Sequence, residues 1–358
     1  MAIITAKASA LAQNFEKLTA LIAPAKVFPF IKADGYGLGL DFVVRTLAEH
    51  GADTFCTARY EDASAIRQML PEAQILLCSV YEKPDTVKAI LAENIIATVG
   101  SVEGLKLCAA LREGELAVNV AIDTGMGRFG LRKDELSEFA ELYKSISNIH
   151  IVSAFTHFAN CFGGKKGDKA TLIQLERFNE TVQEMRNLGL NPGILHAANS
   201  AAALLLPESR LDAVRCGSAL LGRSAGSSAA GLEKVGRLYG EVLCLRTLRK
   251  GETIGYGSIF KAKRDMTIAI IDCGHADGVF LTREHDGFRF SDRLRYIKRD
   301  LTQNRLCGTF NGQKLPVVGR VGLTNLAVSV VNSDLKAGDL IEFDFNPVFC
   351  GAKEIRYE

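Results

Sequence analysis

The stretch Val27-Phe28-Pro29-Phe30-Ile31 is an apolar run of strand length that ends in Lys32, and the glycine-rich run Ala33-Asp34-Gly35-Tyr36-Gly37-Leu38-Gly39 follows it. Such a strand delivers an ammonium group to a place where water is scarce, where desolvation lowers the pKa of a lysine and the free amine can form a Schiff base. The glycines let backbone N–H groups and the Tyr36 hydroxyl approach an anion such as a phosphate. Taken alone, the fragment fits a simpler interpretation better, in which Lys32 reaches into solvent and the glycines form a turn.

Short apolar strands alternate with amphipathic helices through the first two-thirds of the chain. We expect the strands at residues 26–32, 52–58, 73–80, 95–99, 116–123, 149–157, 193–198 and 213–220. Eight such strands predict an α/β fold of the (β/α)8 TIM-barrel type. An open doubly wound sheet usually has fewer strands, and no G-x-G-x-x-G motif follows the first strand here.

The sequence changes character after about residue 231, where helical patterns become rare. We expect short strands at residues 242–248, 266–272, 278–282, 314–321, 326–331 and 340–345. The segment 224–231 is rich in serine, alanine and glycine, which is typical of a linker. We therefore predict a barrel domain over residues 1–230 and a C-terminal, mainly β domain over residues 231–358.

Composition narrows the class of protein. The chain has 358 residues, of which 47% are hydrophobic and 23% charged, and its formal net charge is +2. Without a basic block, this balance argues against a nucleic-acid or membrane-surface partner. Nine cysteines without a C-x-x-C pair predict neither a disulfide framework nor a metal site. No leader and no long apolar run are visible, so we expect a soluble, cytoplasmic protein.

Polar residues collect where the predicted barrel strands end, and the active sites of such barrels lie at those ends. The segments are Lys32, Asp123-Thr124-Gly125-Met126-Gly127-Arg128, Thr156-His157-Phe158, His196-Ala197-Ala198-Asn199-Ser200 and Arg215-Cys216-Gly217-Ser218. The last two loops are the usual phosphate site of a TIM barrel. Ser200, Gly217 and Ser218 supply a hydroxyl and backbone N–H groups there.

Each of these residues also has a simpler explanation. His157 fits a buried or rim histidine, Arg128 a surface ion pair, and Asn199-Ser200 a helix cap. Arg215 is harder to explain, because it stands inside an apolar strand and an unpartnered buried arginine is unfavourable. The simpler explanations would have to hold at five strand ends together, so we favour an active site.

The sequence resembles the alanine racemase family, whose members are fold-type III enzymes that depend on pyridoxal 5′-phosphate. The matching segments are Ile31-Lys32-Ala33-Asp34-Gly35-Tyr36-Gly37, Asp123-Thr124-Gly125-Met126-Gly127-Arg128-Phe129-Gly130, Phe155-Thr156-His157-Phe158, His196-Ala197-Ala198-Asn199-Ser200-Ala201, Val214-Arg215-Cys216-Gly217 and Gly255-Tyr256-Gly257. Weaker matches at Ala276-Asp277-Gly278 and Val318-Gly319-Arg320-Val321 reach into the C-terminal domain. Their order and spacing make the resemblance specific.

The resemblance implies two acid/base groups on opposite faces of the cofactor. Lys32 would hold pyridoxal 5′-phosphate covalently and serve as one catalyst. Tyr256 of the partner subunit would be the second, in a homodimer with active sites at the subunit interface. Racemisation needs this arrangement, since a proton leaves one face of Cα and returns to the other. Both groups need lowered pKa values, for which positive charge from an Arg215–His157 chain is the plausible source at Tyr256.

The remaining roles that the resemblance implies concern binding. Tyr36, Ser200 and the Gly217-Ser218 backbone would bind the phosphate, and Asn199 belongs to the same loop. His157 would stack on the pyridine ring. Arg128 would contact the ring hydroxyl and the substrate carboxylate. Arg215 would face the ring nitrogen and oppose its protonation, which suppresses transamination.

Several positions depart from the family pattern. Ala121 stands where a lysine, sometimes carbamylated, often supports the arginine at position 128. His275 replaces a tyrosine of the substrate entrance, and Leu323-Thr324 stands in place of a Met-Asp pair. Leu221 and Phe162 replace a common tyrosine and an aspartate. These changes spare the cofactor site but alter the expected substrate-binding wall, formed with Arg128. Two outcomes stay open: retention of alanine, or a shift to a related small amino acid such as serine.

Two other functions compete with racemisation. Decarboxylases of the same fold type use a cysteine in the C-terminal domain, and Cys273, Cys307 and Cys350 are available but lack a recognisable motif. A non-catalytic pyridoxal-phosphate carrier with this barrel usually lacks the β domain. We therefore expect an amino-acid racemase.

Overall fold

Two compact units make up the chain, one spanning Ala8–Val235 and the other formed by Met1–Lys7 with Gly236–Glu358. The computed structural model describes residues 2–111, 114–161, 165–281, 306–331, 333–349 and 354–358, with the single positions 290, 294 and 297. Among these residues, every helix falls short of the length and apolar character that a membrane span requires.

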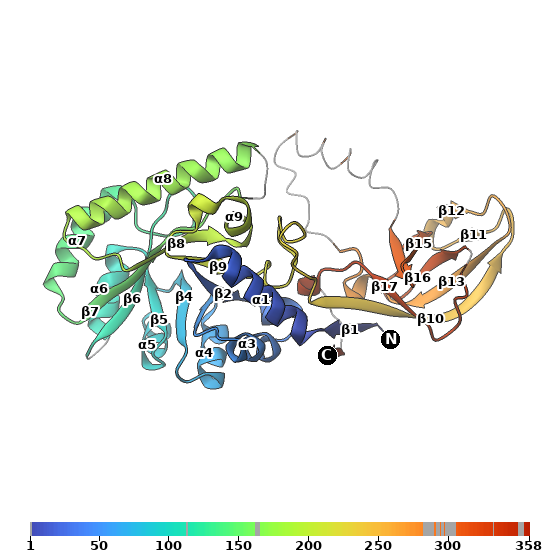
Figure 1. Cartoon of the computed structure of the whole chain (residues 1–358), viewed down its shortest axis with the longest axis horizontal. Helices are drawn as coiled ribbons and strands as arrows, with labels where there is room; N and C mark the ends of the chain where they lie inside the picture. The colour runs from blue at the N-terminus through green and yellow to red at the C-terminus, as the bar shows by residue number, and fades with distance from the viewer. Residues whose placement is uncertain are drawn as a thin grey trace. The chain divides into compact units, whose positions relative to one another are not determined.

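The first unit contains a closed barrel of eight parallel strands, as the sequence predicted (Figure 1). The strands are β2 (Lys26–Ile31), β3 (Thr54–Thr57), β4 (Gln74–Val80), β5 (Ile96–Val99), β6 (Leu116–Ala121), β7 (Ile149–Phe155), β8 (Ile194–Asn199) and β9 (Ala213–Cys216). The first and last strands close the ring by pairing Phe28 with Arg215. This closure places the ends of β2 and β9 beside each other.

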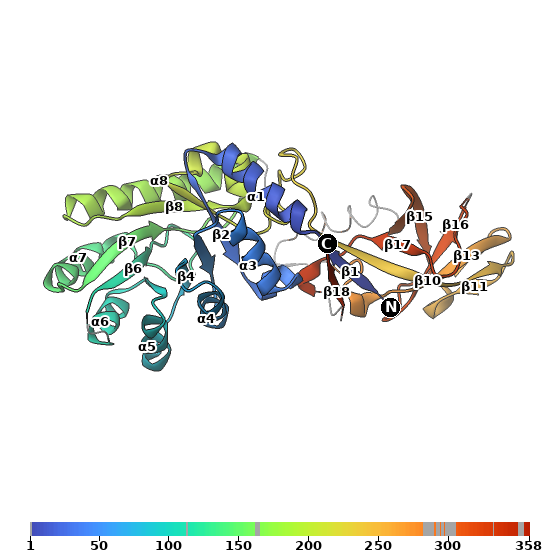
Figure 2. The same cartoon turned by 60° about the horizontal axis from the view of Figure 1, so that its bottom comes forward.

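Helices connect the strands and cover the outside of the barrel, as Figure 2 shows for α4, α5 and α6. They are α1 (Ala8–Ile22), α2 (Ala33–Gly37), α3 (Leu40–Glu49), α4 (Tyr60–Met69), α5 (Pro84–Ala92), α6 (Val102–Leu111), α7 (Leu136–Ser145), α8 (Lys165–Asn187) and α9 (Ser200–Leu205). The longer helices are amphipathic, and the side chains they bury include Leu47 of α3, Ile66 of α4 and Phe139 of α7. The α8 helix spans 23 residues, and its buried side chains include Leu175 and Phe178.

The barrel interior contains an apolar layer and a row of buried polar side chains that are hydrogen-bonded to one another. Phe28, Cys56, Phe155 and other buried side chains pack together as one apolar cluster. Elsewhere the Ser153 hydroxyl donates to Asn119 Oδ1 at 2.8 Å, and Asn119 Nδ2 donates to Thr98 Oγ1 at 3.1 Å. Each of these buried polar groups has a partner, which removes the penalty of leaving it unpaired.

The second unit is a mainly antiparallel β structure. Its strands are β1 (Ile3–Ala6), β10 (Gly236–Leu248), β11 (Thr253–Ile254), β12 (Phe260–Lys261), β13 (Met266–Asp272), β14 (Cys307–Phe310), β15 (Gln313–Val318), β16 (Leu326–Val330), β17 (Leu340–Phe343) and β18 (Ile355–Tyr357). Six of them close on themselves, because β13 pairs with both β16 and β10. The β1 and β18 strands extend the sheet from β10.

The division into units differs from the predicted boundaries at both ends. Residues at the start of the chain were assigned to the barrel, but β1 pairs with β10, where Ile3 lies opposite Tyr239. The β1 strand has only four residues, and such a short segment does not indicate in the sequence which distant strand it will pair with. This pairing was therefore not predicted from the sequence. Of the expected strand at 278–282, the described residues 278–281 form a single bridge, between Val279 and Phe345. The β14 strand was not anticipated.

One buried side chain fastens the start of the barrel unit to its end. Asn14 of α1 is 0% exposed, and its Nδ2 donates to the carbonyls of Leu220 and Glu233 at 2.8 and 2.7 Å. Its Oδ1 accepts the Glu233 N–H at 2.8 Å. All of its amide groups are therefore used to hold the segment that follows β9 against α1.

Replacing Asn14 with alanine should lower the free energy of unfolding by about 2 kcal/mol, because the backbone groups at positions 220 and 233 lose their partners. Urea denaturation measures this change. The matched control is Gln13→Ala, since Gln13 is the exposed neighbour on the same helix. Equal stability of both variants would contradict a structural role for this asparagine.

Candidate active site

Lys32 lies at the C-terminal end of β2 and begins an unusual left-handed turn. Ala33, Asp34 and Tyr36 have φ angles of 51°, 52° and 59°, and Gly35 has 60°. Left-handed backbone is unfavourable by roughly 1–2 kcal/mol per residue outside glycine, and such strain gathers at functional sites. The turn is held by the bond from Tyr36 N–H to the Lys32 carbonyl at 2.8 Å. The side chain of Asp34 supports it further by accepting the Leu40 N–H at 2.8 Å.

The Lys32 side chain is exposed in this chain, so the expected shortage of water around it is not observed. The strand itself is buried up to Ile31, which is 1% exposed. The lysine stands one residue beyond, at the rim of the barrel. Its ammonium nitrogen lies 5.7 Å from the ring centres of both Phe30 and Tyr36.

The left-handed turn brings Tyr36 back onto the loop after β9. A Cβ atom at Gly217 would overlap the Tyr36 hydroxyl and stand 2.8 Å from the Phe30 carbonyl oxygen, so only glycine fits this position. Burial raises the pKa of Tyr36, and the nearby Cys216 adds to this effect. Tyr36 therefore stays a neutral phenol that can donate a hydrogen bond to an anion.

Ser200 organises the other side of the same loop. Its hydroxyl oxygen accepts the N–H groups of Gly217 and Ala219 at 3.0 and 3.1 Å. Asn199 caps the N-terminus of α9. Its Oδ1 accepts the N–H groups of Ala201 and Ala202 at 3.1 and 3.0 Å. The Tyr36, Ser200 and Gly217-Ser218 groups thus gather at the ends of β2, β8 and β9. The capping role that the sequence also allowed is the one observed for Asn199.

Arg215 is the central buried charge of the barrel, with an exposed fraction of 3%. One terminal nitrogen donates to the His196 carbonyl at 2.7 Å and meets His196 Nδ1 at 2.8 Å. The other donates to the Thr156 carbonyl at 2.7 Å and lies 3.4 Å from His157 Nδ1. The guanidinium carbon also lies 4.9 Å from the Phe155 ring centre. These contacts join the ends of β7, β8 and β9.

The two histidines beside Arg215 are held neutral. Burial, together with the positive charges of Arg215, Arg128 and Lys32, lowers the pKa of His157 to about 3. Burial and Arg215 also lower the pKa of His196, which stacks on Phe155 at 5.4 Å. The positive charge of the expected Arg215–His157 chain therefore resides on the arginine, and His157 offers a neutral ring.

The Arg128 loop is shaped by a single carboxylate. Asp123 Oδ1 accepts three successive backbone N–H groups, from Gly125, Met126 and Gly127, at 2.9 to 3.0 Å. This arrangement folds the loop so that Arg128 follows directly. The loop closes where Leu131 N–H donates to the Ala121 carbonyl at 2.8 Å.

Arg128 is exposed, and its guanidinium carbon lies 4.7 Å from the Phe129 ring centre. Among the described residues, no carboxylate lies within ion-pair distance of it. Ala121, which stands where a supporting lysine is common, is buried and carries no polar group. The Phe129 ring is thus a cation–π contact of Arg128 in this structure.

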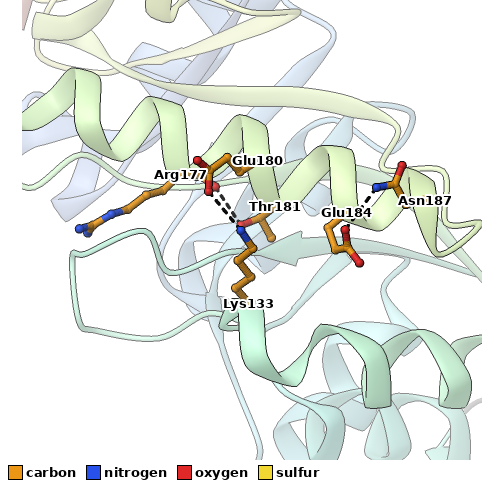
Figure 3. A network of polar contacts seen from close by, with 6 residues as sticks. All are labelled: Lys133, Arg177, Glu180, Thr181, Glu184 and Asn187. Atoms are coloured by element: carbon orange, nitrogen blue, oxygen red, sulfur yellow. Dashed lines mark hydrogen bonds and ion pairs between the residues drawn. The ribbon is translucent and has the colours of Figure 1, made fainter.

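The α8 helix supports both of these loops, which the sequence did not reveal. Arg177 donates to the Thr124 carbonyl at 3.1 Å, and Gln174 reaches Thr124 and the Thr156–Ala159 segment. Figure 3 shows Arg177 on the helix that also carries Glu180, whose carboxylate pairs with Lys133 at 3.1 Å. In sequence these are ordinary polar positions of an amphipathic helix, so no signal distinguished them.

The predicted residues of the second unit lie on neighbouring loops of that unit. Tyr256 is 79% exposed and follows Gly255, which packs near the Arg320 backbone. His275 N–H donates to the Gly322 carbonyl at 3.0 Å, next to Leu323, which is 73% exposed. Thr324 follows it and is also exposed.

Three cysteines of the second unit were candidates for a decarboxylase centre. Cys273 is 0% exposed and Cys307 half-buried, whereas Cys350 and Phe162 lie outside the described residues. Within the described part of the chain, no group of three or more His, Cys, Asp or Glu side chains could hold a metal ion.

Two family models match this chain. The alanine racemase N-terminal domain matches residues 7–225, and the alanine racemase C-terminal domain matches residues 235–347. The chain belongs to the alanine racemase family. Alanine racemase of Sorangium cellulosum is 32% identical over 327 residues, which cover 89% of this chain and 80% of that protein. The Desulfovibrio desulfuricans enzyme is 31% identical over 330 residues, covering 90% and 83%.

Solved alanine racemase structures share the fold. The Bartonella henselae protein, solved with covalently bound pyridoxal phosphate, aligns with a TM-score of 0.81 at 25% identity, covering 100% of this chain and 99% of that one. The Streptomyces lavendulae protein aligns with a TM-score of 0.84 at 21% identity, covering 100% and 97%. The family resemblance read from the motifs is therefore confirmed.

The lowered histidine pKa values predict the pH dependence of stability. A histidine kept neutral in the fold takes up a proton more readily when unfolded, so its contribution is present above about pH 6.5 and is lost as the pH falls toward 3. The slope is about 1.4 kcal/mol per pH unit for each such histidine. His157→Gln should flatten the dependence of unfolding free energy on pH between 7 and 5. The control is His50→Gln at an exposed position; equal slopes in both variants would contradict the assignment.

Proposed function

We propose that this protein is a pyridoxal-phosphate-dependent amino-acid racemase that interconverts L- and D-alanine. Membership of the alanine racemase family supports the activity, and one structural observation supports the site. Lys32, the Tyr36–Gly217 cradle and the Arg215–His157 pair gather at the carboxyl end of a single barrel. This is where TIM-barrel enzymes carry out their chemistry.

The residues at this end of the barrel fit the cofactor. The absence of a side chain at Gly217 admits the Tyr36 hydroxyl itself to this loop, which also carries the Ser218 N–H, and the Ser200 hydroxyl binds the Gly217 N–H. Neutral hydroxyls and backbone N–H groups suit a phosphate. His157 would pack its neutral ring on the pyridine, and Arg215 would face the ring nitrogen. When bound, pyridoxal phosphate withdraws electrons from Cα of the amino acid, which weakens the bond to the α-proton.

The chain's own residues would move that proton. Lys32 would hold the cofactor and, on one face of the substrate, take up or return a proton at Cα through its Nζ atom. Tyr256 of the partner subunit would do the same through its hydroxyl on the other face. Arg128 would bind the substrate carboxylate. Arg215 would oppose protonation of the ring nitrogen, which limits transamination. We therefore propose a homodimer, in the cytoplasm, with each site completed by its neighbour.

Two substitutions test the two-base assignment. Lys32→Ala should abolish both the covalent cofactor and racemisation, because the only amine at this strand end is removed. Tyr256→Phe should keep the cofactor and lower kcat by about 10²- to 10⁴-fold, the usual effect of losing a general acid/base. Loss of optical rotation and the visible absorption of the cofactor report these results. The control is Tyr357→Phe, an exposed tyrosine of the same unit, which should leave activity unchanged.

Mixing the two inactive variants tests whether Tyr256 acts across subunits. A heterodimer of Lys32→Ala with Tyr256→Phe contains one doubly defective site and one intact site. After random exchange of subunits, about a quarter of wild-type activity should return. No recovery, despite heterodimers seen by native mass spectrometry, would show that the tyrosine acts within its own subunit.

The substrate range is tested separately. His275 and the Leu323-Thr324 pair replace a tyrosine and a Met-Asp pair common in the family, which supports access for a larger or more polar amino acid such as serine. We expect kcat/KM for L-serine within about tenfold of that for L-alanine, since one added hydroxyl is weakly rejected by a tolerant pocket. A preference for alanine well above about 100-fold would reject the serine hypothesis. Release of CO2 instead of loss of optical rotation would favour the decarboxylase alternative. Binding of the cofactor without turnover of any amino acid would favour a non-catalytic carrier.

A further inference from the structure

Gln174 of α8 is a buried amide whose groups all point to the two loops that carry Arg128 and His157. Its exposed fraction is 5%. Its Nε2 donates to Thr124 Oγ1 at 3.1 Å and to the His157 carbonyl at 3.3 Å, while its Oε1 accepts the Ala159 N–H at 2.9 Å. One side chain thus bridges the loop after β6 and the loop after β7.

The bridge is completed by a contact between the loops themselves. The hydroxyl oxygens of Thr124 and Thr156 lie 2.8 Å apart, and both residues are buried, with exposed fractions of 3% and 1%. Arg177, one helical turn after Gln174, donates to the Thr124 carbonyl at 3.1 Å. The β6 loop is therefore attached to α8 at both its side chain and its backbone.

The segment from Thr156 to Ala159 is held from two directions. From the barrel interior, Arg215 donates to the Thr156 carbonyl at 2.7 Å and lies 3.4 Å from His157 Nδ1. From α8, Gln174 binds the His157 carbonyl and the Ala159 N–H. Both sides of the peptide that carries the His157 ring are therefore fixed, one by the Gln174 amide and the other by Arg215.

We propose that Gln174 is a positioning residue for racemisation, which sets the spacing between the Arg128 loop and the His157 ring. This inference rests on the proposed function. Gln174 touches neither substrate nor cofactor in it, and acts through the two loops. Displacing a binding group by about 1 Å can lower a rate by about 100-fold, so a three-bond link between a carboxylate-binding loop and a ring-stacking residue is well placed to control kcat.

The chemistry of the site requires a neutral amide. Both N–H groups of Gln174 face acceptors, one of them the His157 carbonyl, and its oxygen faces a donor, so a carboxylate of the same shape keeps the bond to Ala159 but loses the one to His157. That carboxylate would also stand against the His157 carbonyl. An apolar side chain of similar length loses all three bonds while it fills the same volume.

The test uses Gln174→Glu and Gln174→Met in the holoenzyme, with Gln183→Glu, an exposed glutamine of the same helix, as control. We expect kcat to fall about 10- to 100-fold in both variants, with KM changed less than about threefold and the control at wild-type rate. The kcat of Gln174→Glu, divided by the wild-type kcat at the same pH, should rise as the pH is lowered. The protonated carboxyl then has an O–H group that can donate to the His157 carbonyl again. A purely structural role would not produce this pH-dependent recovery.

A second readout needs neither activity nor cofactor. In the apoprotein, hydrogen exchange at the Ala159 amide should stay slow in Gln174→Glu, which keeps the acceptor, and accelerate in Gln174→Met.

If either variant does not fold, Thr124→Val and Thr124→Ser replace them. We then expect kcat to fall in Thr124→Val and to be restored in Thr124→Ser. Wild-type kcat in folded Gln174→Met would overturn the inference but leave the racemase proposal intact. Failure of the wild type to racemise any amino acid would instead overturn the proposed function, whatever the exchange rates.

Discussion

The site depends on one guanidinium buried inside the barrel. Arg215 is 3% exposed and lies on the last strand, where a charge without partners would be strongly unfavourable. The carbonyls of Thr156 and His196 supply those partners, so burial of the charge fixes the ends of β7, β8 and β9 relative to one another. The same charge, together with burial, keeps His157 and His196 neutral. Stability and chemistry are therefore linked through a single side chain.

A second constraint acts at the seam where the barrel closes. The strained left-handed turn after Lys32 returns Tyr36 to the loop after β9, and only a residue without a side chain at position 217 admits it. Since β2 and β9 are neighbours only in the closed ring, closure brings Lys32 and Tyr36 beside the loop that holds Gly217. The unfavourable backbone of residues 33–36 is held by the bonds of Tyr36 and Asp34 described above. Asn14 then holds the chain that leaves this loop.

Much of the barrel could be read from the sequence, because strand-length apolar runs between amphipathic helices have few other solutions. All eight expected barrel strands are present, and Arg215 stood out since an arginine in such a run needs a partner. Gln174 was missed, because a glutamine on an amphipathic helix carries no local mark of burial. The pairing of β1 with β10 was missed for a related reason, since it joins residues more than two hundred positions apart.

The sequence by itself determined the order of strands and helices in the barrel, the residue types at the strand ends and the family, because these follow from local periodicity and from motifs that are contiguous in the chain. The tertiary structure alone decided which groups meet. It made His157 neutral, left Lys32 exposed at the rim and placed Gln174 between two loops. Burial, hydrogen-bond geometry and the pKa values that follow from them depend on neighbours distant in the chain, and only closure of the barrel brings those neighbours into contact.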